Sequence, residues 1–281
     1  MKALVSIVMP VYNSARYLSE AIESVRQQSY PHWQLIIVDD ASEDESRAIA
    51  RRYARCDARI ELVELAVNVG AAAARNRGLE RARGRYLAFL DSDDRWAACK
   101  LERQIAYMEA EGVCFSCSYA YVLDAQGRIV DELRCPLSIR YNDLLKTNHI
   151  VHSSVVYDAS ILGKQQYPSH FPRHEDIAVW LRILKEGRSC CAVPEFLTMW
   201  RRRKDSISSD KIEAMYWEWK LLREIEGLGV VQSVYYFSHW AVRGMVKHMK
   251  MALKGDVQAA SGLPFRRHVS RDQCRHSARS G

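Results

Sequence analysis

The sequence YLAFLDSDD at residues 86–94 joins five apolar residues to one serine and three aspartates. An unbroken apolar run of this kind is typical of a strand that is buried on both faces. In an extended chain, residues i and i+2 point to the same side, so Asp91 and Asp93 are expected to converge. Acids directly after a buried strand are unfavourable unless something pairs with them. The residues alone leave two interpretations open, a ligand site and an Asp-rich turn.

The ligand that best suits Asp91 and Asp93 is a divalent cation. Carboxylates at a strand end leave coordination positions open, which suits Mg²⁺ or Mn²⁺, because these ions keep several waters and bridge to diphosphate oxygens. Such an ion neutralises and orients a departing diphosphate. The ligand-site interpretation therefore predicts Mg²⁺ or Mn²⁺ as cofactor and a substrate that contains a diphosphate.

Strand and helix patterns alternate through the first 110 residues. Continuous apolar strands joined by helices predict an α/β fold, with a mostly parallel sheet that helices cover on both faces. Ligands of such folds bind beyond the carboxyl ends of the strands. The expected strands are residues 4–9, 35–38, 60–63 and 86–90, and the expected helices are residues 15–28, 43–53 and 71–81.

The rest of the chain has a less regular pattern. We expect a helix up to about residue 110, a strand-like stretch at 113–123, mixed structure after it, and a helix at 177–186 that Gly187 ends. Two C-terminal helices are expected, at residues 211–225 and 231–254. From residue 255 the sequence is rich in Ser, Arg and Gly, which predicts a disordered tail.

Charge and composition exclude several classes of protein. The chain has 281 residues, of which 48% are hydrophobic, enough for a sizeable core. The net charge is +7, and residues 231–281 carry all of it, with nine basic and two acidic side chains. The first 230 residues are neutral, so we expect no nucleic-acid partner.

Cysteine content and hydropathy bear on the compartment. Eight cysteines are too few for a disulfide scaffold in 281 residues, and the sequence has no pattern of a secretory leader. The charge-free stretch at residues 227–242 is shorter than a spanning helix needs. We therefore expect a cytoplasmic protein without a transmembrane segment.

Three further segments place polar residues at the same expected edge of the sheet. Residues 10–13 (PVYN) alone predict a turn into a helix. Asp39 and Asp40 can accept hydrogen bonds from a base or ribose, or can cap the next helix. After residues 68–70 (NVG), Arg75 can reach a phosphate or pair with an acid. The alternative for this last segment is an Ala-rich helix packed tightly on the sheet.

Together these segments resemble the family 2 glycosyltransferases, which have the nucleotide-diphospho-sugar-binding GT-A fold. The resemblance covers about residues 4–205, and its motifs lie at residues 5–13, 36–42, 68–78 and 89–94. It implies that Pro10, Tyr12 and Asp39 hold the nucleotide base, usually uracil, and that Asn68 and Arg75 line the nucleotide side of the site. It further implies that Asp91 faces the ribose or donor sugar and that Asp93 ligates the metal on the diphosphate.

The acids before the helix at 177–186 resemble the Glu-Asp element of the same family. From the residues alone, Glu175 and Asp176 are first-turn acids that the helix dipole stabilises. The resemblance implies instead that Asp176 is the catalytic base of an inverting enzyme, with Glu175 as its substitute. A single displacement would convert an α-linked donor into a β-linked product. The loop at 170–174 would then contribute to acceptor binding.

The segment at residues 199–208 (MWRRRKDSIS) stands where many members of the family have a Tyr-Arg pair, a His and a Ser. Arg203 or Lys204 occupies the place of that His. A diphosphate clamp and a basic surface loop are both consistent with this composition.

The C-terminal helix has a basic side, formed by Arg243, Lys247, Lys250 and Lys254, and an apolar side that includes Val231, Val234 and Val242. One interpretation is a surface helix that docks on the body by its apolar side. The other is a basic amphipathic helix on an anionic membrane surface. The second interpretation suits an enzyme at the inner face of the cell membrane whose saccharide acceptor is lipid-linked.

The sequence thus predicts a GT-A domain over residues 1–209, with a nucleotide-binding half at 1–98 and an acceptor half at 99–209. C-terminal helices at 210–254 and the basic tail at 255–281 follow. The predicted activity is inverting, metal-dependent transfer from a nucleotide-diphospho-sugar, a UDP-sugar, to a saccharide acceptor in cell-surface polysaccharide synthesis. A sugar-phosphate nucleotidyltransferase and a non-catalytic sugar-binding or membrane-associated protein are the alternatives.

Overall fold

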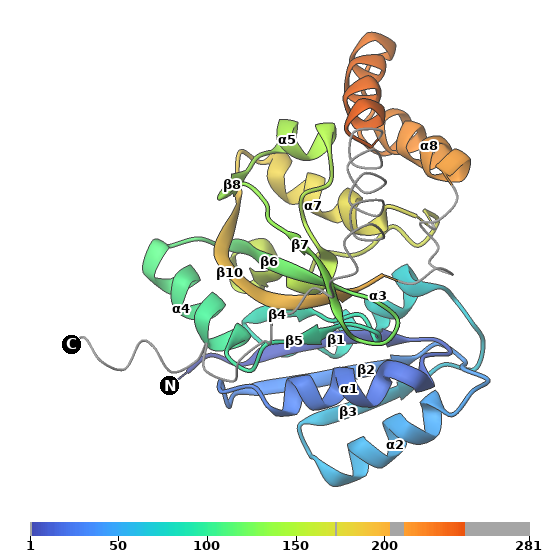
Figure 1. Cartoon of the computed structure of the whole chain (residues 1–281), viewed down its shortest axis with the longest axis vertical. Helices are drawn as coiled ribbons and strands as arrows, with labels where there is room; N and C mark the ends of the chain where they lie inside the picture. Colours follow the sequence, from blue (N-terminus) through green and yellow to red (C-terminus); the bar gives the residue numbers. More distant parts are fainter. Residues whose placement is uncertain (1, 172, 203–210, 245–281) are drawn as a thin grey trace, which may run out of the picture.

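The computed structural model describes residues 2–171, 173–202 and 211–244 (Figure 1). Its N-terminal part contains four parallel strands in the spatial order β3, β2, β1, β4. A helix connects each of these strands to the next along the chain. The elements in chain order are β1 (Val5–Val11), α1 (Ala15–Arg26), β2 (Trp33–Asp39), α2 (Ser46–Cys56), β3 (Ile60–Glu64), α3 (Ala71–Arg81) and β4 (Tyr86–Phe89). The predicted α/β fold is confirmed.

These strands are buried on both faces, as their unbroken apolar runs predict. Ile7 packs in one core cluster, with side chains of α1, whereas the next residue, Val8, packs in the other cluster, with side chains of α3. Helix α3 lies so close to the sheet that a Cβ atom on Gly78 would come within 2.5 Å of Val8 Cγ1. Glycine is therefore required at this position for α3 to pack on β1.

The sheet continues beyond β4 with mixed strand directions, and ten strands take part within the described residues. Strand β9 pairs antiparallel with β4, and β6, β10 and β5 follow in that order, while β7 pairs with β6 and β8 pairs with β10. The further elements are β5 (Arg95–Trp96), α4 (Lys100–Glu111), β6 (Phe115–Leu123), β7 (Ile129–Leu133), β8 (Ser138–Ile139), α5 (Tyr141–Lys146), a 3-10 turn (His152–Ser154), β9 (Val156–Asp158), α6 (Ala159–Leu162), α7 (Glu175–Lys185) and β10 (Cys190–Arg201).

Strand β10 is the longest of the elements that the sequence pattern did not predict. Pro194 and the exposed Glu195 interrupt its apolar pattern, and its pairing with β6 shifts register between Val193 and Phe196. An irregularity of this kind accommodates a proline inside a strand. Because β10 spans the mixed part of the sheet, it brings Arg201 next to the acidic loop that follows β4.

The C-terminal helices are α8 (Lys211–Lys220), a π-helical turn (Leu221–Ile225) and a helix that begins at residue 230 and is described as far as residue 244. The predicted basic residues Lys247, Lys250 and Lys254, the predicted tail at 255–281, the domain boundary at 209, and Arg203 and Lys204 lie outside the described residues. Within the described ranges, every helix is too short or too polar to cross a bilayer.

Candidate active site at the carboxyl edge of the sheet

The acidic loop that follows β4 lies at the carboxyl edge of the parallel strands, as predicted. The Asp91 amide donates to Ser153 Oγ at 3.1 Å, and Asp91 Oδ1 accepts a hydrogen bond from Arg75 Nη2 at 2.9 Å. His152 Nδ1 lies 3.5 Å from the same oxygen. Burial alone would raise the pKa of Asp91, but the charges of Arg75 and His152 outweigh burial and hold that pKa well below its usual range. Asp91 is therefore ionised and fixed in orientation.

Arg75 joins two carboxylates that are 84 residues apart in the chain. Its Nη2 donates to Asp91, and its Nη1 donates to Glu175 Oε1 at 2.7 Å. The side chain is buried, which opposes the charge, yet the two carboxylates raise the pKa of Arg75 above its ordinary value. Of the two roles that the residues left open, pairing with acids is therefore the one seen here. Arg75 links the acidic loop to the first turn of α7.

Asp94 is a positioning residue to which the sequence analysis gave no role. Its carboxylate is buried and accepts hydrogen bonds from Ser153 Oγ at 2.5 Å and from the Arg201 amide at 2.7 Å. Burial first, and then the charges of Asp93 and Asp91, raise the pKa of Asp94 well above its usual range. Asp94 thus fastens the acidic loop to the end of β10. The signal in the sequence that could have indicated this role is that the motif contains a third aspartate, at position 94.

The acidic loop has the chemistry of a divalent-cation site. Asp91, Asp93 and Asp94 lie within four consecutive residues. The charges of the first two raise the pKa of Asp94, so a cation bound at this loop would relieve the repulsion between them. Within the described residues, no three acid, His or Cys side chains are arranged as a closed metal cage. An open set of one or two carboxylates suits Mg²⁺ or Mn²⁺, which complete their shells with water and phosphate oxygens.

The two carboxylate oxygens of Asp39, at the end of β2, differ in their hydrogen bonding. Its Oδ2 accepts hydrogen bonds from Arg47 Nε at 2.8 Å and from the Ser42 amide at 3.3 Å. Its Oδ1 is buried and has no hydrogen-bond partner in the part of the chain that the structure describes. A buried acceptor without a partner is unfavourable by about 1–3 kcal/mol. Asp39 Oδ1 is thus suited to accept an N–H group from a ligand.

Asp40 holds the neighbouring loop, and both of its carboxylate oxygens are occupied. They accept hydrogen bonds from the amides of Val69 and Gly70, at 2.8 Å and 2.9 Å. The exposed Asn68 donates from Nδ2 to the Asp40 carbonyl at 3.2 Å. Gly70 has a φ of 85°, a conformation that favours glycine. Asp40 therefore holds the loop that leads into α3, and no side-chain cap of the next helix, α2, is seen among the described residues.

The loop after β1 is joined to the loop after β2. Register pairs Val11 with Asp39 and Pro10 with Val38. Asn13 donates from its amide to Ser42 Oγ at 3.1 Å and accepts from the Glu43 amide at 2.9 Å. Tyr12 is 47% exposed beside these contacts. The structure therefore brings Pro10, Tyr12 and Asp39 to one end of adjacent strands.

The first turn of α7 presents two acids with different surroundings. Glu175 is bonded to Arg75. The side chain of Asp176 is partly exposed and makes no hydrogen bond or ion pair within the described residues, although its charge acts on His174. His174, just before the helix, lies with Nδ1 3.0 Å from Glu218 Oε2 of α8. Burial lowers the pKa of His174, but Glu218 outweighs burial and raises it. Sequence reasoning missed the contact with Glu218, because no local pattern indicates it.

Arg201 anchors the end of β10 beneath the acidic loop. Its Nε donates to the Asp93 carbonyl at 2.8 Å, its Nη2 donates to Glu20 at 2.9 Å, and its guanidinium lies over the Tyr17 ring. The segment at 199–208 was expected to supply a diphosphate clamp or a surface loop. Its described part, which ends at residue 202, supports the acidic loop from within.

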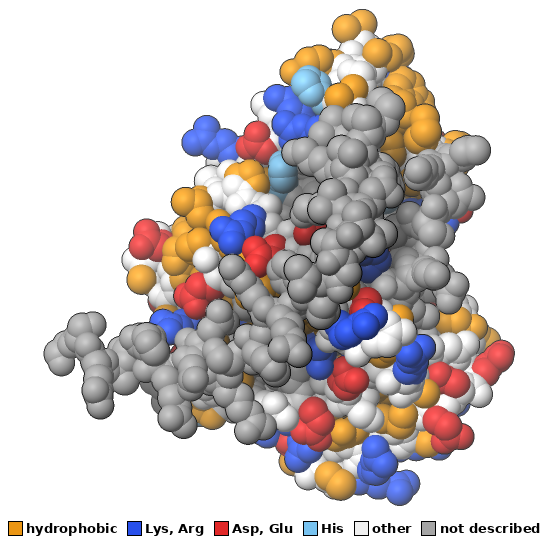
Figure 2. All heavy atoms as spheres, in the orientation of Figure 1, with side chains coloured by type: hydrophobic (Ala, Val, Ile, Leu, Met, Phe, Trp, Pro, Cys, Tyr) orange, Lys and Arg blue, Asp and Glu red, His pale blue; other side chains and the backbone are white. Residues whose placement is uncertain are grey.

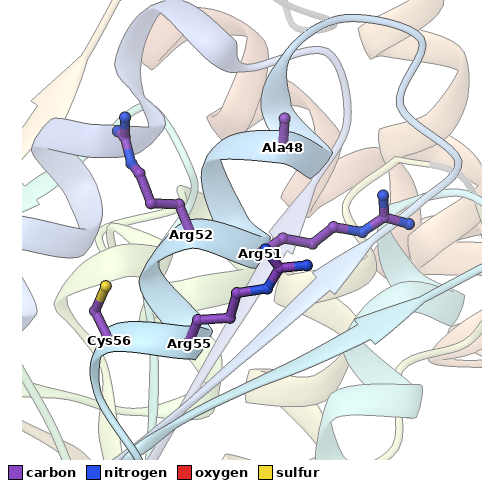
Figure 3. Close-up of a pocket in the computed structure, with 5 residues that line it drawn as sticks. All are labelled: Ala48, Arg51, Arg52, Arg55 and Cys56. Atoms are coloured by element: carbon purple, nitrogen blue, oxygen red, sulfur yellow. The ribbon is translucent and has the colours of Figure 1, made fainter.

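A separate hollow of about 370 Å³ lies on the outer surface of α2, where Arg51, Arg52 and Arg55 project beside Ala48 and Cys56 (Figure 3). Arg51 is paired with Glu64 at 2.6 Å. All the side chains of this hollow come from one helix, and none of the strand-end residues described above lines it. The convergent carboxylates at the sheet edge therefore define the candidate site.

Comparison with known proteins agrees with this geometry. The sequence profile described as "Glycosyl transferase family 2" matches residues 6–162. Bacillus subtilis TuaG, provisionally named a teichuronic acid biosynthesis glycosyltransferase, is 40% identical over 249 residues, which cover 88% of this chain and 98% of TuaG. The Escherichia coli UDP-Glc:alpha-D-GlcNAc-diphosphoundecaprenol beta-1,3-glucosyltransferase WfgD is 36% identical over 246 residues, which cover 87% of this chain and 95% of WfgD.

Among solved structures, the mannosyltransferase PcManGT from Pyrobaculum calidifontis, in complex with GDP-Man and Mn²⁺, superposes with a TM-score of 0.64 at 19% identity, over 94% of this chain and 77% of that one. The match shows the GT-A glycosyltransferase fold. The chain belongs to glycosyl transferase family 2 and is a glycosyltransferase. Family membership sets aside the nucleotidyltransferase and non-catalytic alternatives.

Proposed function

We propose that the protein transfers a sugar, with inversion, from a UDP-sugar to a saccharide that is carried on a lipid diphosphate. The observation that carries this proposal is the assembly at one sheet edge of an unpartnered Asp39 oxygen, an acidic loop and the open Asp176 carboxylate. Arg75 connects the acidic loop to the helix of Asp176. In this proposal Asp39 recognises the nucleotide base, the acidic loop stabilises the departing diphosphate, and Asp176 removes the proton of the acceptor hydroxyl.

Recognition of the nucleotide base rests on Asp39. Its buried Oδ1 would accept the N–H of a base such as uracil, with Pro10 and Tyr12 beside the same strand end. A ligand N–H that donates to this oxygen would remove the unfavourable free energy of an unpaired buried acceptor, and this gain would contribute to the free energy of nucleotide binding. The relative WfgD is named for UDP-Glc, which supports uracil over another base.

The diphosphate would lie at the acidic loop. Asp93, with Asp91 beside it, would hold a Mg²⁺ or Mn²⁺ ion, and the structural neighbour PcManGT was solved with Mn²⁺. When bound, such an ion supplies charge stabilisation for the departing diphosphate. Arg75 keeps Asp91 ionised and oriented toward the donor, and Asp94 and Arg201 hold the loop from below.

Asp176 would act as the base. Its carboxylate takes the proton of an acceptor hydroxyl, whose oxygen attacks the anomeric carbon as the bond from that carbon to the diphosphate oxygen breaks. The electron pair of the broken bond leaves with the nucleoside diphosphate, and the configuration of the anomeric carbon is inverted. Glu175, the substitute, is committed to Arg75, which favours Asp176.

The acceptor class is inferred from relatives. WfgD is named for an acceptor on diphosphoundecaprenol, and TuaG for teichuronic acid synthesis. We therefore propose that the acceptor saccharide is linked through a diphosphate to a polyprenyl lipid, and that the protein works at the inner face of the cell membrane in cell-surface polysaccharide synthesis.

A transfer assay tests the proposal. The full-length protein would be incubated with Mn²⁺, a GlcNAc-diphospho-lipid acceptor, and UDP-glucose, UDP-GlcNAc or GDP-mannose in turn. We expect nucleoside diphosphate release and a glycosylated lipid with a UDP-sugar, and no product when a chelator removes the metal. Product formed only from GDP-mannose, or transfer that persists with chelator, would contradict the donor or the metal assignment.

A further inference from the structure

The helix at residues 230–244 exposes an aliphatic face to solvent. Val231 is 84% exposed, Val234 is 52% exposed and Val242 is 53% exposed, with Tyr235 at 49% beside them. At about 100° per residue these four side chains lie within an arc of about 100°. Figure 2 shows hydrophobic side chains gathered at this end of the molecule. A contiguous exposed apolar face of this kind indicates an interaction surface.

The opposite side of the same helix holds it to the body. Tyr236 OH donates to Asn142 Oδ1 of α5 at 3.0 Å, and the Phe237 ring packs edge-on against Trp219 of α8. Ser233 is buried. Of the two interpretations of this helix, docking by the valine side therefore does not hold for the described part, because aromatic side chains make the contact and leave Val231, Val234 and Val242 exposed.

Basic groups lie beside the aliphatic face. Lys146 Nζ lies 5.9 Å from the centre of the Tyr235 ring. The pKa of His149 is lowered, mainly by burial and also by the nearby positive charge of Arg243. Residues 227–244 contain no Asp or Glu. An apolar strip flanked by cationic side chains complements the acyl boundary and headgroups of an anionic bilayer.

The face belongs to the side of the molecule that carries Asp176. Helix α8 contacts the start of α7 through Glu218 and His174, and Trp217 of α8 packs on Phe171. In Figure 1 the helix at 230–244, drawn in orange-red, lies at the end of the molecule opposite α2. A surface that received this face would therefore lie on the acceptor side of the sheet edge.

We infer that Val231, Val234, Tyr235 and Val242 insert into the interface of an anionic bilayer, with Lys146 and Arg243 at the headgroups. This arrangement would hold the site where a lipid-diphosphate acceptor resides. The relevance to the acceptor rests on the proposed function, whereas membrane binding itself does not. The occupant of the face is the bilayer, not a second copy of the chain.

Vesicle flotation of the full-length protein tests the inference. Vesicles of phosphatidylethanolamine with phosphatidylglycerol should carry the protein upward, and vesicles of phosphatidylcholine alone should carry less. The double variant Val231→Ser/Val234→Ser should lower the partition coefficient at least about tenfold. The matched variant Val130→Ser/Ile161→Ser, which alters two exposed aliphatic residues outside the C-terminal helices, should float like the unmodified protein.

Three outcomes would overturn the inference: no flotation of the unmodified protein, equal flotation of both variants, or a dimer that the Val231→Ser/Val234→Ser change converts to monomer. Transfer to a detergent-solubilised acceptor separates this test from the proposed function. The Val231→Ser/Val234→Ser variant should retain that transfer while it loses flotation. Flotation without any transfer by the unmodified protein would contradict the proposed function and leave the membrane surface intact.

Discussion

The two sides of the sheet edge are held together by different kinds of contact. On the β1 and β2 side, Asn13 and Asp40 bond to backbone amides of neighbouring loops, and the ion pair of Arg47 with Asp39 joins residues only eight apart in the chain. On the α7 side, the contacts are ion pairs between side chains from distant segments, Arg75 with Glu175 and His174 with Glu218. The first side is therefore held mainly by loops that are closer together in the sequence, whereas the second depends on ion pairs between distant segments and on the C-terminal helices.

Replacing Asp176, the proposed catalytic base, gives the largest expected effect. Asp176→Asn keeps the shape of the side chain but removes its proton affinity, so kcat should fall about 100- to 10,000-fold. The affinity for UDP, measured by calorimetric titration, should stay the same, because the donor side does not use Asp176. A variant with an unchanged kcat would remove Asp176 as the base. Weakened UDP binding would show that the two sides are not separable.

Replacing Asp39, the residue proposed to recognise the nucleotide base, should have a smaller effect, which falls on KM and not on kcat. Asp39→Asn weakens a charge-assisted acceptor, so KM for the UDP-sugar should rise about 10- to 100-fold while kcat at saturation changes little. Arg77→Gln on α3 is the matched control, because it breaks an exposed surface pair with Glu80. An Asp39→Asn enzyme with the same KM as the control would contradict the assignment.

The smallest expected effect is a pH dependence of the α7 side. The folded-state pKa of His174 is raised, so its contribution to stability is fully present below the unfolded value of about 6.5 and is lost as pH rises through the folded value. The charged groups that act on it are Glu218, Glu175 and Asp176. Thermal unfolding midpoints should therefore decline more steeply above pH 6.5 in the unmodified protein than in His174→Gln.

The exposed His32 provides the control for this measurement. His32→Gln should leave the pH profile of the unfolding midpoint unchanged. Parallel profiles for the unmodified protein and His174→Gln would mean that the contact between His174 and Glu218 does not couple α8 to α7.

The contrast between the two sides also explains how much the sequence could predict. Strands β1, β2 and β4 are local apolar runs, so their positions and the polar residues at their ends were predictable from period and composition. The acidic loop was recognisable for the same reason. Strand β10 was not, because Pro194 and a register shift break its pattern.

Contacts between distant residues escaped the sequence for a different reason. Arg75 had two possible partners by charge, an acid or a phosphate, and only the folded chain shows that Asp91 and Glu175 both reach it. Two features depend on which groups the folded chain covers: the Asp39 oxygen without a partner among the described residues, and the exposed side of the helix at 230–244. Such features are properties of packing and have no local signal.

The central claim is that Asp176 drives a single displacement on a donor held at the acidic loop. The most direct test is the anomeric configuration of the transferred sugar, read by proton NMR on product made from an α-linked UDP-sugar. A single displacement with Asp176 as base predicts a β linkage. An α linkage would contradict it, because retention requires a different arrangement of nucleophile and base.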